Sequence, residues 1–144
     1  MLVNFDTDPA IEQKDEFKTF AKDIAMQIAA AIPQFVRQEE VPSDVIEKEK
    51  EILKAQALNE GKPENIVDKM VVGRVQKYYK EICLLEQPYI KDPDMSVKQY
   101  VEATAKALGT NIDVIKFARF EKGEGIEKKE DDFAAEVAKA AGTN

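Results

Sequence analysis

The stretch IDVIKFARF, Ile112–Phe120, decides the fold, because it predicts a β-strand in a chain whose other apolar residues mostly recur at helical spacing. Apolar residues occupy the even positions 112, 114, 118 and 120, but Ile115 and Phe117 occupy odd ones. This pattern predicts a strand that is covered on parts of both faces and lies inside a sheet. A second strand is predicted at Leu2–Phe5, before the turn-forming run 6–9. We expect the two strands to pair antiparallel.

Helical periodicity marks most of the remaining chain. The apolar stripe of the first helix ends before Pro33, and the Ser96–Gln99 pair forms an S-x-x-Q capping box for a later helix that ends at Gly109. The expected helices lie within residues 17–32, 43–60, 63–82, 96–109 and 130–141. Together these elements predict one domain over residues 1–144. Its class is α+β, with four to five helices packed around a small antiparallel sheet made by the N-terminal strand and a strand near 111–121.

The helix expected at 63–82 carries the broadest apolar face, so we expect it to be the central, most buried helix. Gly61 should close the helix before it by adopting a left-handed conformation, and Pro63 should begin the new one. Gly73 in its middle costs about 1 kcal/mol relative to Ala, which predicts another backbone passing close by. Arg74 lies on the apolar side, which predicts a structural ion pair rather than a binding role.

Composition excludes several classes of function. The net charge of −7 disfavours direct binding of nucleic acid, which needs a concentrated Lys/Arg surface. No apolar run approaches the roughly 20 residues of a membrane span. The single cysteine, Cys83, cannot form an internal disulfide, and its apolar neighbours predict a buried structural role over a bridge between two copies.

Catalytic and nucleotide-binding motifs are also missing. The chain has no histidine, which removes His-based triads and imidazole metal sites, and its carboxylate pairs are best interpreted as solvated surface. Gly61-Lys62 lacks the other residues of a phosphate-binding loop, and Gly123-Glu124-Gly125 is best interpreted as a turn between strand and helix. We therefore expect no cofactor, no metal and no covalent chemistry.

Several ordered blocks of sequence carry a family resemblance. GKPENIVDKMVVGR begins at Gly61, CLLEQPYI at Cys83 with a Lys-Asp-Pro turn behind it, RFEKGEGIEKKE at Arg119 and DFAAEVA at Asp132. In this order they resemble the C-terminal half of elongation factor Ts, over nearly the whole chain. The resemblance implies a protein that binds the GTPase elongation factor Tu and promotes release of its GDP. It also implies a short, single-core version without the family's N-terminal helical module.

The resemblance implies a partner-binding site in the first turn of the chain. The family's run Thr-Asp-Phe-Val, whose Asp-Phe pair is thought to press on the switch region of elongation factor Tu, is matched by Thr7, Asp8, Pro9 and Ala10. Gln27 stands where many members have His, in the helix that resembles the one facing the partner. The residues expected to contact the partner are Asp6, Thr7, Asp8, Pro9, Ala10 and Gln27.

Pro9 leaves two hypotheses open, because the matching family residue is aromatic. The first is an active guanine-nucleotide exchange factor of translation elongation. The alternative is an exchange-deficient binding or scaffold protein that retains only the core fold. Both imply a location in the cytoplasm, or in a plastid or mitochondrial matrix, and both allow a homodimer.

Overall fold

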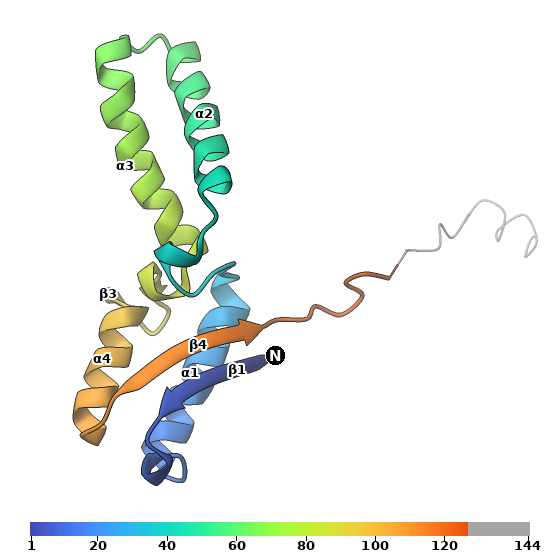
Figure 1. The fold of residues 1–144 in the computed structure, drawn as a ribbon, viewed down its shortest axis with the longest axis vertical. Helices are drawn as coiled ribbons and strands as arrows, with labels where there is room; N and C mark the ends of the chain where they lie inside the picture. The colour runs from blue at the N-terminus through green and yellow to red at the C-terminus, as the bar shows by residue number, and fades with distance from the viewer. Residues whose placement is uncertain (127–144) are drawn as a thin grey trace, which may run out of the picture.

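The computed structural model describes residues 1–126 and has an α+β fold, as predicted (Figure 1). Within these residues, four α-helices are joined by short strands and single-turn 3-10 helices, which are labelled η. In chain order the elements are β1 (Leu2–Thr7), η1 (Pro9–Ile11), α1 (Asp15–Ala31), η2 (Gln38–Glu40), α2 (Ser43–Asn59), α3 (Glu64–Ile82), η3 (Leu84–Glu86), β2 (Pro88–Tyr89), β3 (Asp92–Ser96), α4 (Val97–Leu108) and β4 (Ile112–Ala118). The helix expected within 130–141 lies outside the described residues.

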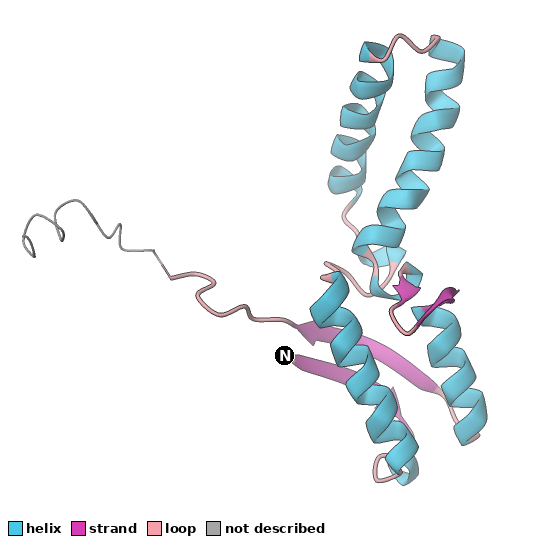
Figure 2. Cartoon of the chain, turned by 180° about the vertical axis from the view of Figure 1, so that it is seen from behind, coloured by secondary structure: helices cyan, strands magenta, loops and turns pink. Residues whose placement is uncertain are grey.

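The main sheet pairs the two ends of the described chain. β1 and β4 run antiparallel, with Leu2 opposite Ala118 and Thr7 opposite Ile112, which confirms the predicted pairing. α1 and α4 both lie on one face of this sheet (Figure 2). β2 and β3 form a separate antiparallel hairpin before α4, which the sequence analysis did not identify.

The prediction that the strand at Ile112–Phe120 lies inside a sheet is wrong for the part of the chain that the structure describes, where β4 pairs with β1 alone. The register shifts where Asn4 pairs with Lys116 and Phe5 pairs with Val114, so Ile115 is the extra residue of a β-bulge. A bulge moves the following side chains to the other parity. Apolar residues on both parities therefore reflect this bulge and not burial of both faces.

The core lies between α1 and the sheet, and α1 is the most buried of the described helices. Phe20, Ile24 and Ile28 of α1 expose 1% of their surface or less. Phe5 of β1 packs against Phe17 and Phe20, with ring centroids 5.7 and 5.5 Å apart. Apolar residues at three- and four-residue spacing explain this burial, since they place one continuous stripe against the sheet.

α2 and α3 form an antiparallel pair that extends away from the sheet and is called the arm below (Figure 1). The expectation that α3 is the central, most buried helix is wrong, because Ile66 and Val72 expose 45% and 64% of their surfaces. Only the side of α3 that carries Val67, Val71 and Val75 is covered, by α2. The broad apolar face thus predicted correctly that this segment is a helix, but it did not predict which element covers that face.

The ends and caps of the helices were predicted more accurately than the burial of the helices. Gly61 has the expected left-handed conformation (φ +73°), and Ser96 and Gln99 make both bonds of the capping box. Arg74 forms the predicted ion pair, with Glu60 at 3.2 Å. The close backbone expected at Gly73 is absent among the described residues, since a Cβ placed there would meet no atom within 4 Å.

Candidate partner-binding site

The tip loop, residues 6–10, lies at the exposed end of β1. Asp6 and Thr7 complete the strand, and Asp8 caps the η1 turn by accepting a hydrogen bond from the backbone N–H of Ala10 at 2.9 Å. Pro9 begins the turn, where its missing N–H leaves no bond unmade. Four of the five residues are exposed, with Thr7 half-buried. The fold therefore presents the predicted contact residues to solvent.

The tip loop is fixed to the core on both sides. Ile11, directly after it, is buried in the core and its N–H bonds to the carbonyl of Asp8 at 3.0 Å. Thr7 donates its hydroxyl to the carbonyl of Asn111, at 3.1 Å, which ties the loop to the segment before β4. These contacts give the loop a defined shape without a partner, which lowers the entropy cost of binding.

The tip loop is acidic. Asp6 lies opposite Asp113 in the sheet, and like charges in this position repel each other. Arg37, from the segment after α1, offsets the repulsion through its ion pair with Asp113. Asp8 is exposed, and one of its carboxylate oxygens is engaged by the loop itself. The loop thus offers negative charge and hydrogen-bond acceptors to a partner.

Gln27 lies far from the other predicted contact residues. It is 12 residues beyond Asp15, the first residue of α1, which is about 18 Å along the helix. Its side chain is fully buried, with Nε2 donating to Gln87 Oε1 at 3.3 Å and to the carbonyl of Pro88 at 3.1 Å. Its Oε1 accepts from the N–H of Ile90 at 2.8 Å. In this conformation a partner cannot touch the amide of Gln27, whereas it can touch the tip loop.

Sequence reasoning missed a buried carboxylate cluster next to Gln27. Asp23 accepts hydrogen bonds from the hydroxyls of Tyr89 and Tyr100, at 3.0 and 2.9 Å, and from Nζ of Lys91 at 2.6 Å. The two tyrosine rings stack with centroids 4.2 Å apart. A signal was present in the sequence, because Asp23 and Gln27 are polar residues on the apolar stripe of α1.

Burial and hydrogen bonding act on this cluster in opposite directions. Burial raises the pKa of Asp23, but the bonds from Lys91, Tyr100 and Tyr89 outweigh it and leave that pKa below its ordinary value. Burial, with the neighbouring carboxylate, raises the pKa of both tyrosines. Asp23 is therefore an ionised acceptor that joins α1, the β2–β3 hairpin and α4.

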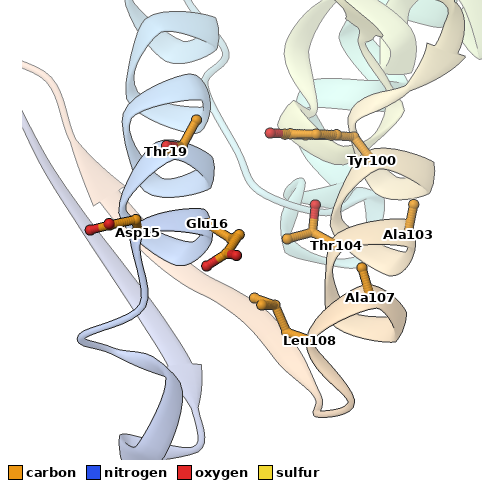
Figure 3. A pocket seen from close by; sticks show the side chains of 8 residues that line it. All are labelled: Asp15, Glu16, Thr19, Tyr100, Ala103, Thr104, Ala107 and Leu108. Carbon is orange, nitrogen blue, oxygen red and sulfur yellow. The ribbon is translucent and has the colours of Figure 1, made fainter.

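A groove of about 730 Å³ opens between α1 and α4 (Figure 3). Asp15 and Glu16 line its α1 side, and Ala103, Ala107 and Leu108 line its α4 side. Figure 3 shows the carboxylates of Asp15 and Glu16 on the opposite side of the groove from the small α4 side chains. A surface of this kind suits contact with another protein better than chemistry on a small molecule, since no nucleophile and base meet in it.

Within residues 1–126, no three His, Cys, Asp or Glu residues are grouped so that they could hold a metal ion. No helix in this range is long and apolar enough to cross a membrane.

Comparisons with known proteins agree on one family. The sequence model of the family described as Elongation factor TS matches residues 6–124. The chain is 60% identical over 142 residues to Elongation factor Ts of Carboxydothermus hydrogenoformans, an alignment that covers 99% of this chain and 65% of that protein. It is 62% identical over 135 residues to Elongation factor Ts of Heliobacterium modesticaldum, covering 94% of this chain and 62% of that protein. The chain thus spans a little under two thirds of the length of these relatives.

Proposed function

Because this chain belongs to the elongation factor Ts family, we propose that it binds elongation factor Tu and promotes the release of GDP from that GTPase. The exposed, core-anchored tip loop is the observation that carries the proposal. It is the segment that matches the family's Thr-Asp-Phe-Val run. The proposed contact residues are Asp6, Thr7, Asp8, Pro9 and Ala10.

The proposed mechanism is linkage between two binding events. A factor that binds the nucleotide-free GTPase more tightly than the GDP-bound form must weaken GDP binding by the same factor. This mechanism needs a preformed surface and no bond-making group. Asp8 supplies negative charge close to the partner's nucleotide site, where it would disturb the coordination of the magnesium ion. The chain therefore acts by binding and not as an enzyme.

Gln27 enters this proposal indirectly. Since its side chain is buried against Gln87, Pro88 and Ile90, it supports the far end of α1 and would not contact the partner itself in this conformation. α1 connects it to the tip loop, because the helix begins at Asp15, shortly after η1. We therefore place Gln27 in the scaffold that presents the loop.

A second candidate function is favoured by Pro9. Its small ring replaces the aromatic residue of the family's run and cannot fill the pocket that an aromatic side chain would occupy. The chain would then bind elongation factor Tu without accelerating exchange. In either case we propose a cytoplasmic or organellar-matrix location and no direct contact with nucleic acid.

The rate of GDP release separates the two candidates. Elongation factor Tu loaded with a fluorescent GDP analogue is mixed with excess unlabelled GDP, with and without micromolar amounts of this chain. The exchange proposal expects faster loss of fluorescence in proportion to the added chain. If the chain binds elongation factor Tu but does not accelerate GDP release, the result would contradict the exchange proposal and support the scaffold function.

A further inference from the structure

The arm and the core have separate hydrophobic clusters. The arm cluster contains Val67, Val71 and Val75 and ends at Cys83. The core cluster includes the next residue, Leu84, together with Ile24 and Ile28 of α1. Apolar packing is the main source of rigidity between elements, and here it is not continuous across the junction. The direction of the arm must therefore be set mainly by the polar contacts at its base.

Four backbone hydrogen bonds between residues 34–36 and 82–85 form part of this base. Among the side chains, Gln87 makes the most extensive contacts. Its side-chain Nε2 donates to the carbonyl of Glu81 at 2.8 Å and to that of Ala31 at 3.3 Å. Both carbonyls belong to the last turn of a helix, α3 and α1 respectively, where no backbone N–H of the helix is available to them. One amide group thus joins the C-terminal ends of the arm and of the central core helix.

The remaining polar atoms of Gln87 are also satisfied. Its Oε1 accepts from Gln27, and its backbone carbonyl accepts from the N–H of Val97, the first residue of α4, at 2.9 Å. Gln27 in turn bonds to Pro88 and Ile90, on both sides of Tyr89. Both glutamines are buried, with Gln87 exposing 3% of its surface. Buried amides with complete partners hold one geometry, because any other leaves polar groups unpaired.

We propose that Gln27 and Gln87 form a joint that fixes the direction of the arm relative to the core. The joint lies at the C-terminal end of α1, and the tip loop precedes the N-terminal end of that helix. The two glutamines are positioning residues for the arm, since the contacts they make are all within the chain. This inference does not depend on the proposed partner, and it is tested on the free chain.

The test is a distance measurement between spin labels on the arm and on the core. Asn59→Cys places one label at the far end of α2, and Lys106→Cys places the other near the end of α4, both at exposed positions. Cys83 is buried, and burial raises the pKa of its thiol to about 11, so it should not take up label. The chain without added cysteines checks this.

We expect one narrow distance in the otherwise unchanged chain. Gln87→Met keeps the length of the side chain but removes its three hydrogen bonds, and we expect the narrow distribution to be replaced by a broad one. Gln27→Met, which spares both helix ends, should broaden it less. Val114→Ala, a buried truncation in β4, serves as the control that loosens the core without touching the joint. The proposed joint would be refuted if the distance distribution is unchanged in both glutamine variants. It would also be refuted if Val114→Ala broadens the distribution as much as they do.

Discussion

At Asp23, a single buried carboxylate holds three elements together, so its removal should be felt as lost stability. We expect Asp23→Asn to lower the free energy of unfolding at pH 7 by about 1–3 kcal/mol, because the tyrosine hydroxyls and Lys91 lose an ionised acceptor. Urea unfolding followed by circular dichroism measures the change. Asp94→Asn, at an exposed position, should have no measurable effect.

The same substitution makes a prediction about pH. The pKa of Asp23 is lower in the folded chain than its ordinary value, so its contribution is complete above about pH 4–5 and is lost as the pH falls through the folded pKa. The stability difference between the original chain and Asp23→Asn should therefore shrink as the pH falls from about 5 through the lowered pKa of Asp23. A difference that stays constant over this range would show that Asp23 is not held in its ionised form.

Pro9 is the residue whose substitution tests the proposed exchange activity most directly. We expect Pro9→Phe to tighten binding to elongation factor Tu or to speed GDP release, since an interface aromatic contributes about 2 kcal/mol, or roughly 30-fold. Fluorescent GDP release and a pull-down measure the two effects. Gln76→Phe adds the same side chain at an exposed position on the arm and should change neither. If both variants behave like the original chain, the tip loop is not at the interface.

At the level of elements, two glycines give opposite predictions. Gly73→Ala in α3 should raise the free energy of unfolding by about 0.5–1 kcal/mol, because helix propensity improves and nothing lies within 4 Å of the new Cβ. Gly61→Ala should lower it by about 1–2 kcal/mol, because its φ of +73° strains any residue with a Cβ. Thermal unfolding of both variants tests the pair. A destabilising Gly73→Ala would reveal a contact that the described residues do not make.

Element boundaries and caps could be predicted from sequence because they depend on local chemistry. Gly61, Ser96 and Gly109 each act through their own backbone or their nearest neighbours, and all three are found as expected. The burial of α3 could not be predicted, since an apolar face does not specify which element covers it. The bulge at Ile115 could not be predicted either. A bulge and a strand buried on both faces each place apolar residues at both odd and even positions, so the sequence does not distinguish them.

For the candidate site, too, part could be predicted from the sequence and part depended on tertiary contacts. The family resemblance singled out the tip loop, and four of its five residues are exposed. The burial of Gln27 did not follow from the family resemblance, which placed its helix near the partner without fixing which side the residue faces. Its partners, Gln87 and Pro88, are about sixty residues away in sequence, and only the folded chain brings them together.

In the whole molecule, the tip loop and the arm lie at opposite ends of α1. The tip loop precedes α1, and the arm leaves the core beyond the other end of that helix (Figure 1). The net charge of −7 makes the scaffold acidic, so association with any partner should weaken as salt screens a complementary basic surface. A partner held by the tip loop would meet a preformed surface, which is what a factor acting through linkage requires.

The affinity of this chain for elongation factor Tu in two nucleotide states tests the central claim most directly. Calorimetric titration of the nucleotide-free protein and of the GDP-bound protein gives both dissociation constants. We expect tighter binding to the nucleotide-free form, with the affinity for GDP reduced by the same ratio when the chain is present. Equal affinity for both forms would contradict the account, because such a chain could not shift the GTPase toward its empty state.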